Sequence, residues 1–243
     1  MFNPKYTFKS FVTADSNFFS YAATKAVAEA PGKSYNPLFI YGGVSFGKTH
    51  LLHAIGQHVL RKKRGARVAY LTAERFTSEY VDAIQKNKLV AFRKKYRQTD
   101  VLLIDDIQYL GGKVRIQEEF FHTFNFLQEA HKQIVIAGNG SPSEIRGLEK
   151  RLVSRFEWGL VADLLQPDTE TRLAILRNKK ATGIQMSDDI LHFLADRICT
   201  DIRRLEGAMI HVVSYAALTG KKLTIKLVEN LLWKIIQEER KIA

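Results

Sequence analysis

Cysteine and long apolar runs are both scarce in this chain of 243 residues. The one cysteine, Cys199, allows no intrachain disulfide and no cysteine zinc cluster, which fits a reducing compartment. No apolar run approaches the roughly 20 residues that span a bilayer, and residues 1–6 lack the apolar core of a secretion signal. We therefore expect a cytoplasmic protein.

Acidic residues are fewer than basic ones. The chain has 25 Asp and Glu and 37 Lys and Arg, which gives a formal net charge of +12. The basic residues form local groups at 61–64, 93–97 and 221–222. Such groups gain affinity for phosphates by releasing counterions, so the charge favours nucleic acid as a partner. Solvated helix ends are the alternative interpretation of each group.

A glycine-rich stretch, Gly42 to Thr49, fits the pattern G-x-x-x-x-G-K-[ST]. The apolar run 37–41 before it predicts a buried strand, and apolar residues at helical spacing over 51–59 predict a helix after it. In this order the backbone N–H groups can cradle phosphates, Lys48 can reach the outer phosphates and Thr49 can bind magnesium. The stretch predicts a nucleoside triphosphate site, and a chance match in a loop is the alternative.

A second motif is the apolar run 101–104, which is followed by Asp105 and Asp106. This pattern is typical of a Walker B strand. Asp105 would hold magnesium together with Thr49, and Asp106 would orient the water that attacks the terminal phosphate. A strand end that simply faces solvent is the other interpretation.

Strand patterns near 37–41, 68–72, 101–104 and 133–137 alternate with helical patterns, one of them from Gln117 to about His131. The alternation predicts an α/β fold whose parallel sheet is covered by helices. After Pro167 the patterns are helical, near 169–182, 187–198, 201–218 and 224–239. We expect a boundary near 165–168, with an α/β domain over 1–166 and a small all-α domain over 167–243.

Several further motifs accompany the phosphate-binding pattern: 49–52 (THLL), 103–108 (LIDDIQ), 117–121 (QEEFF), 154–156 (SRF), 158–160 (WGL), Arg203 and 205–207 (LEG). Together they resemble the bacterial replication initiator family DnaA over nearly the whole chain. The resemblance implies an AAA+ P-loop NTPase domain with a helical lid, using ATP or ADP and Mg²⁺. It implies that the nucleotide contacts Gly42, Gly43, Val44, Ser45, Phe46, Gly47, Lys48, Thr49 and His50.

The resemblance also implies partners. Full-length members carry an N-terminal helicase-contacting domain and a C-terminal domain that reads duplex origin boxes. We expect this chain to be a fragment without either, acting at the nucleoid on single-stranded origin DNA. A helical oligomer of copies, the replicative helicase and regulators are the other implied partners.

Two arginines and one asparagine take their roles from the resemblance alone. Arg155 matches the arginine finger that reaches the ATP of a neighbouring subunit, whereas physical reasoning alone favours an exposed arginine in a surface ion pair. Arg203 matches the lid arginine that contacts nucleotide within its own subunit. Its neighbour Arg204 is expected to be solvated. Asn139 lies at the sensor-one position, where it can orient water.

Other implied contacts lie on DNA and on adenine. Val81 matches a position that contacts single-stranded DNA, in a helical insertion over 77–97, although a core residue packed with Ile84 is the alternative. Lys113 and Arg115 match basic positions on the same surface and are expected in an exposed loop after two glycines. Phe11, Val12 and Asn17 match the segment around adenine, and the alternative is that Phe11 and Val12 only anchor the chain start.

Some positions depart from the family pattern. Ser45 and Phe46 replace a common glycine and a small aliphatic residue of the loop, so nucleotide affinity can differ from that of relatives. Gly140 replaces the arginine that usually follows the sensor-one position. His50 and His53 are three residues apart, but without a third ligand we expect packing rather than metal binding.

The sequence therefore predicts an ATP-controlled assembly module of a replication initiator. In it, ATP joins copies through Arg155 on single-stranded DNA, and slow hydrolysis dismantles them. Two alternatives stay open. One is a regulatory adaptor that stimulates hydrolysis by another initiator, and the other is a motor or helicase-loader ATPase with rapid turnover.

Overall fold

The computed structural model describes residues 2–180 and 186–242. Two compact units make up the chain. The first comprises Met1–Phe11, Asn17–Gly43 and Gly47–Leu164, and the second comprises Val12–Ser16, Val44–Phe46 and Leu165–Ala243. In the described part, no helix has the length and apolar character needed to cross a membrane.

A five-stranded parallel sheet with the order β2-β3-β4-β1-β5 forms the centre of the first unit. Its strands are β1 (Leu38–Gly42), β2 (Val68–Thr72), β3 (Val101–Asp105), β4 (Gln133–Gly138) and β5 (Leu160–Leu164). The four expected strands are all present. β5 was not expected, and it pairs with β1 at the edge of the sheet.

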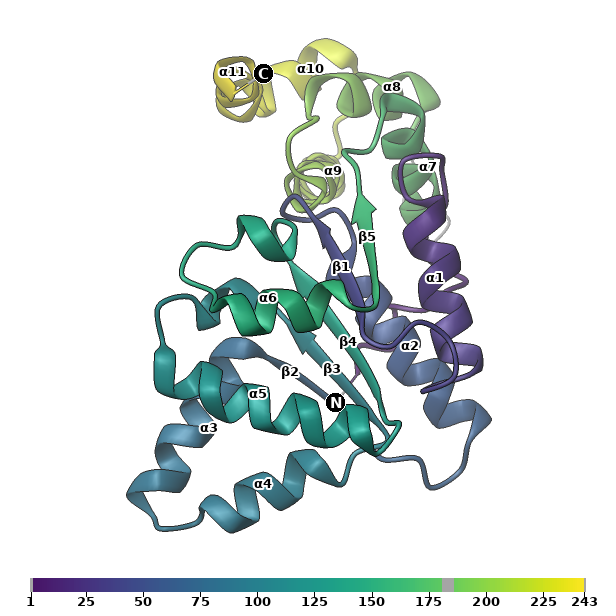
Figure 1. The fold of residues 1–243 in the computed structure, drawn as a ribbon. Helices are drawn as coiled ribbons and strands as arrows, with labels where there is room; N and C mark the ends of the chain where they lie inside the picture. Colours follow the sequence, from purple (N-terminus) through teal and green to yellow (C-terminus); the bar gives the residue numbers. More distant parts are fainter. Residues whose placement is uncertain (1, 181–185, 243) are drawn as a thin grey trace. The chain divides into compact units, whose positions relative to one another are not determined.

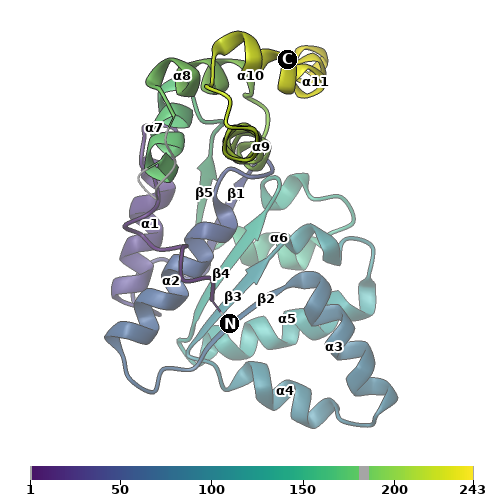
Figure 2. The same ribbon diagram turned by 180° about the vertical axis from the view of Figure 1, so that it is seen from behind.

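Helices cover both faces of this sheet (Figure 1). Helices α1 (Phe18–Glu29) and α2 (Lys48–Lys62) lie on one face, as the reverse view in Figure 2 shows. Helices α5 (Val114–Glu129) and α6 (Lys150–Glu157) lie on the other. β3 and β4 are buried along their whole length, which explains the apolar runs 101–104 and 134–137 within them.

The order of the strands explains where the two sequence motifs meet. The chain leaves β1, forms α2 and returns to the sheet at β2 on the far side, so that β4 lies between β1 and β3. In open parallel sheets, ligands bind beyond the carboxyl ends of the strands, at the point where the strand order reverses. The phosphate-binding pattern follows β1, and Asp105 is the last residue of β3. Both motifs therefore lie at the carboxyl ends of the strands.

Helices α3 (Ala73–Gln85) and α4 (Leu89–Arg97) form a hairpin that includes the helical segment predicted over 77–97 and starts four residues before it. Two carboxylates brace it, the half-buried Glu79 and the buried Glu119. The Tyr96 hydroxyl donates to Glu79 at 2.5 Å, which joins α4 to α3. Glu119 of α5 is 3% exposed and accepts hydrogen bonds from Arg93 at 2.7 Å and Arg97 at 3.3 Å. Glu79 therefore connects the two helices of the hairpin, and Glu119 connects α4 to α5.

The second unit is helical, with α7 (Thr169–Lys180), α8 (Asp188–Arg197), α9 (Ile202–Thr219), α10 (Ile225–Leu231) and α11 (Trp233–Ile242). Leu194, Val212 and Val228 belong to its buried apolar core. The single helix expected over 224–239 is divided at Leu232, and residues 181–182 of the first expected helix lie outside the described residues.

Glu239 of α11 is a buried carboxylate in this second unit, with a side chain that is 2% exposed. It accepts hydrogen bonds from the backbone N–H groups of Cys199 and Thr200, both at 2.9 Å, and from the Thr200 hydroxyl at 2.6 Å. Arg204 lies 3.3 Å from it and also pairs with Glu238. Arg204, which was expected to be solvated, keeps 33% of its side chain exposed but is also held by these two carboxylates.

Candidate functional site

The predicted phosphate-binding loop connects β1 to the first turn of α2. Gly47 has φ = +103°, and a Cβ there would come within 2.7 Å of the Phe11 ring. The position therefore requires glycine. Lys48 is buried at the helix start, where its ammonium donates to the carbonyls of Gly42 and Gly43, both at 2.7 Å. The Lys48 ammonium therefore lies at the start of the loop whose bound phosphates it is expected to contact.

Ser45 adopts φ = +66°, a left-handed conformation that favours glycine. Its hydroxyl oxygen is buried and has no hydrogen-bond partner within the described residues. The departure noted in the sequence therefore has a structural counterpart, because a serine holds a backbone conformation suited to glycine. The same hydroxyl is a polar group that a phosphate oxygen could satisfy.

Asp105 ends β3 and is 2% exposed. One carboxylate oxygen, Oδ2, accepts from the Thr49 hydroxyl at 2.7 Å and from the Tyr70 hydroxyl at 3.1 Å. The other, Oδ1, accepts from the backbone N–H of Asp106 at 3.0 Å. Burial raises the pKa of Asp105 above its ordinary value, and these hydrogen bonds oppose that rise.

Thr49 and Asp105 suit a magnesium ion. Mg²⁺ keeps several waters and usually takes only one or two protein carboxylates together with substrate phosphates. The described residues contain no cluster of three His, Cys, Asp or Glu side chains that could form a closed metal cage. The hydroxyl and the carboxylate, already within hydrogen-bond distance of each other, match the smaller set of ligands that Mg²⁺ needs beside a phosphate.

Asp106 follows with φ = +55°, so its backbone turns sharply at the end of β3. Gln108, in the short 3-10 helix η1 (Ile107–Leu110), donates to the Asp106 carboxylate at 2.8 Å. The side-chain amide oxygen of Gln108, Oε1, accepts from the backbone N–H of Asn139 at 3.3 Å. Gln108 thus connects the two residues expected to orient water, a role that the sequence analysis did not predict for it.

The N-terminal segment packs over α2. The Phe11 ring is stacked with Tyr21 and lies edge-on to His50, with centroids 5.8 and 5.2 Å apart. His50 Nε2 donates to the carbonyl of Thr7 at 2.8 Å, and His53 Nδ1 accepts from the backbone of Asn3 at 2.9 Å. Both histidines therefore pack and form hydrogen bonds, as the sequence suggested.

The other residues predicted around adenine fall in different units. Asn17 is 7% exposed and lies at the start of α1. Val12 belongs to the second unit, as do Val44, Ser45 and Phe46 of the loop. Arg203 is also in that unit, exposed in the first turn of α9, where Asp201 accepts its backbone N–H at 2.7 Å.

Arg155 lies on α6 of the first unit and is half-buried. Its guanidinium lies over two aromatic rings, 5.9 Å from the centroid of Phe121 and 5.6 Å from that of Trp158. Within the described part of the chain, no ion pair of Arg155 is found. The surface ion pair considered for it is therefore not what the structure shows.

Residues predicted to contact DNA lie on α3 and at the start of α5. Val81 and Ile84 are 42% and 44% exposed, so the core position considered for Val81 was wrong. Lys113 precedes α5, and its ammonium lies 3.8 Å from the centroid of the Tyr109 ring. Arg115 is exposed in the first turn of α5 rather than in the expected loop, because that helix starts at Val114.

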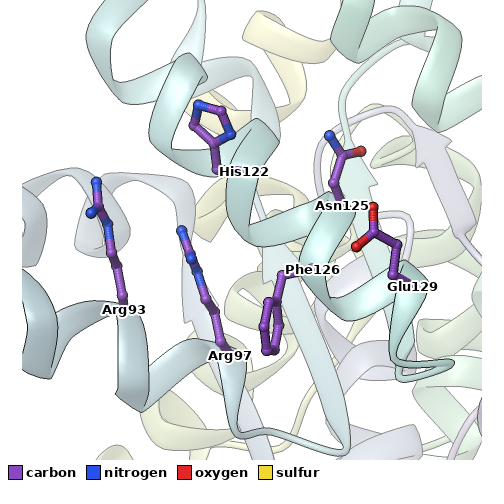
Figure 3. Close-up of a pocket in the computed structure, with 6 residues that line it drawn as sticks. All are labelled: Arg93, Arg97, His122, Asn125, Phe126 and Glu129. Atoms are coloured by element: carbon purple, nitrogen blue, oxygen red, sulfur yellow. The ribbon is translucent and has the colours of Figure 1, made fainter.

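A pocket of about 490 Å³ lies elsewhere, between α4 and α5 (Figure 3). The side chains of Arg93, Arg97, His122, Asn125, Phe126 and Glu129 line it. None of the predicted site residues is among them. The residues predicted to bind nucleotide therefore lie outside this pocket.

The chain is similar in sequence and in fold to bacterial replication initiators. A family model described as the bacterial DnaA ATPase domain matches residues 2–163. Domain III of the Thermotoga maritima replication initiation protein DnaA is 45% identical, with a TM-score of 0.93, and the match covers 97% of this chain and 99% of that one. This chain belongs to the DnaA ATPase-domain family.

Two longer DnaA structures are also similar. A replication initiator DnaA bound to AMPPCP and single-stranded DNA is 36% identical, with a TM-score of 0.83, and the match covers 99% of this chain and 71% of that one. AMPPCP-bound DnaA from Aquifex aeolicus is 38% identical, with a TM-score of 0.81 and coverage of 90% and 67%. The predicted AAA+ P-loop NTPase fold and the DnaA family are therefore confirmed.

Proposed function

We propose that this chain is the ATP-controlled assembly module of a bacterial replication initiator. ATP binds at the P-loop, copies join into a helical oligomer that holds single-stranded origin DNA, and slow hydrolysis switches the oligomer off. The observation that carries the proposal is the meeting of Lys48, Thr49 and Asp105 at one edge of the sheet. Duplex origin DNA, the helicase and regulators at the nucleoid are partners that we assign to the full initiator.

In this proposal the loop and the start of α2 bind the phosphates. Backbone N–H groups and the helix dipole favour the negative charge, and Lys48 reaches the outer phosphates by leaving the carbonyls of Gly42 and Gly43. Thr49 and Asp105 would hold Mg²⁺, which supplies positive charge beside the phosphate oxygens.

Hydrolysis needs a water molecule in line with the terminal phosphate. Asp106 and Asn139 would orient that water, and Gln108 would hold both at a fixed separation through its two hydrogen bonds. The absence of an arginine at Gly140 removes one cation from this part of the site. A site with few charged groups around the water is consistent with slow turnover, as a switch requires.

Assembly is assigned to Arg155. A guanidinium binds phosphate oxygens in a planar, bidentate manner and always keeps its charge. The rings of Phe121 and Trp158 lie beside the guanidinium, which would reach the ATP of a second copy. Arg203 of the helical lid would contact nucleotide within its own copy.

DNA binding is assigned to the α3 surface and the start of α5. The exposed apolar side chain of Val81 can pack against bases, while Lys113 and Arg115 attract phosphates. Such contacts do not depend on the order of the bases. They suit a single strand that is held in a stretched form.

The test is fluorescence anisotropy of a labelled single-stranded oligonucleotide, titrated with the chain in ATP and in ADP at two salt concentrations. We expect tight binding in ATP only. Arg155→Ala should abolish that binding and leave ATP affinity intact, whereas Arg146→Ala, which removes an exposed arginine from a loop, should change neither. Equal binding in both nucleotides would contradict nucleotide-gated assembly, and loss of ATP affinity in Arg155→Ala would contradict the role given to Arg155.

A further inference from the structure

Tyr70 lies in the middle of β2, far in sequence from either nucleotide-binding motif. The parallel register places Tyr70 opposite Leu103 and Thr72 opposite Asp105. Because side chains alternate along a strand, Tyr70 and Asp105 face the same side of the sheet. On β2, Tyr70 lies two residues before Thr72, the residue that pairs with Asp105. Its long side chain extends along the strand direction to the Asp105 carboxylate.

The Tyr70 hydroxyl donates to Asp105 Oδ2 at 3.1 Å, the same oxygen that accepts from Thr49 at 2.7 Å. Asp105 Oδ1 is held separately by the backbone of Asp106 at 3.0 Å. Both carboxylate oxygens are therefore fixed, and the plane of the carboxylate cannot rotate without breaking one of these bonds. If the Thr49 hydroxyl were to bind a metal ion instead, Tyr70 would be the remaining side-chain donor to Oδ2 among the described residues.

The Tyr70 ring is itself held in place. The His53 ring packs against it with centroids 4.3 Å apart, and the Phe2 ring lies 6.0 Å away. His53 in turn accepts a hydrogen bond from the backbone of Asn3 at 2.9 Å. The N-terminal segment thereby closes over Tyr70 and fixes the direction in which its hydroxyl points.

We propose that Tyr70 is a positioning residue for the magnesium–nucleotide site, acting through the Asp105 carboxylate. Its hydroxyl keeps the carboxylate in the orientation that a metal ion needs, and the N-terminal segment keeps Tyr70 in that place. Groups that hydrogen-bond a metal ligand commonly change metal affinity by 10–100-fold when removed. The inference rests on the proposed function, in which Asp105 serves the bound metal.

The experiment measures binding of a fluorescent ATP analogue to Tyr70→Phe, first in EDTA and then during a Mg²⁺ titration. We expect metal-free binding within twofold of wild type, and about a tenfold higher Mg²⁺ concentration for half of the metal-dependent gain. Tyr96→Phe is the matched control, because Tyr96 also donates to a carboxylate, Glu79, at 2.5 Å. It should leave the Mg²⁺ titration unchanged.

Asp105→Asn separates failure of this inference from failure of the proposed function. If Asp105→Asn weakens the Mg²⁺ response and Tyr70→Phe does not, Tyr70 has no positioning role. If Asp105→Asn also leaves the response unchanged, the metal role of Asp105 is wrong, and the proposed function fails with it. Equal loss with and without Mg²⁺ in Tyr70→Phe would make Tyr70 a purely structural residue and overturn the inference.

A double variant provides a second measurement that does not depend on the size of the single effect. If Tyr70 acts through Asp105, Tyr70→Phe should cause no further loss when Asp105→Asn is already present. Additive losses would show that Tyr70 acts independently of Asp105 and would overturn the inference. Circular dichroism of each variant establishes that the comparison is made between folded proteins.

Discussion

Replacing Glu239 by glutamine should destabilise the helical unit by about 1.5–3 kcal/mol at neutral pH, the usual contribution of hydrogen bonds to a charged group. Glutamine keeps the size of the side chain, and its carbonyl oxygen can still accept from the N–H groups of Cys199 and Thr200. Its amide group can donate to the Thr200 hydroxyl, which can turn to accept. Arg204 then faces a donor instead of an acceptor, and the negative charge is lost.

The effect should depend on pH in a defined direction. Burial raises the pKa of Glu239, but hydrogen bonds from Thr200, Cys199 and Arg204 outweigh burial, so the pKa lies below its ordinary 4.5. A carboxylate whose folded pKa is lowered contributes stability that is complete above the unfolded pKa and is lost as pH falls through the folded one. The difference between wild type and Glu239→Gln should therefore be constant above about pH 5 and shrink at lower pH.

Urea unfolding followed by tryptophan fluorescence measures this difference. The chain has two tryptophans, and a Trp158→Phe background leaves Trp233, which lies on the same helix as Glu239. Glu238→Gln is the control, because that carboxylate is 57% exposed and its ion pair with Arg204 should contribute less than about 1 kcal/mol. A Glu239→Gln effect that is absent at pH 7, or that persists unchanged in acid, would refute the reasoning.

Three further predictions concern the first unit and the loop. Ser45→Gly should raise the free energy of unfolding in urea by up to about 1 kcal/mol. Glycine removes the strain of a left-handed φ of +66°, and the greater backbone entropy of unfolded glycine offsets part of that gain. A lower free energy of unfolding in the variant would contradict the presence of strain at Ser45. Gln108→Ala should lower the ATP hydrolysis rate about 10–100-fold in a phosphate-release assay, while ATP affinity stays within about twofold. The reason is that the substitution displaces Asp106 and Asn139 and leaves the phosphate contacts in place. A loss of ATP affinity as large as the loss of rate would contradict this role of Gln108. Phe156→Ala should cost about 3–5 kcal/mol in urea unfolding, because its buried ring contacts Phe39, and a loss below about 1 kcal/mol would show that the core rearranges to fill the space.

The local sequence sufficed wherever one segment carried its own signal. The strand, loop and helix around Lys48 follow one another in the chain, and the run before Asp105 is buried on both faces and therefore uniformly apolar. β5 was missed because Asp163 interrupts a run of only five residues at the sheet edge. The break at Leu232 was missed because that leucine is buried and fits the helical spacing on both sides.

Tyr70 and Gln108 were missed for a different reason. Tyr70 is separated from Asp105 by 35 residues, and only the pairing of β2 with β3 brings them together. Gln108 lies beside Asp106 in sequence, but its second partner, Asn139, is 31 residues away. Contacts of this kind depend on sheet register and on side-chain direction, which no periodicity in the sequence records.

Glu119 of α5 braces the α3–α4 hairpin through two arginines of α4. Arg93 and Arg97 tie α4 to the middle of α5, and Gln117 of the same helix donates to the carbonyls of Leu110 and Gly147. The hairpin is thus joined to α5 by two separate arginines. Under the proposed function, a load on the tip of the hairpin, such as the tension of a stretched strand, would therefore pass through Arg93 and Arg97 to α5.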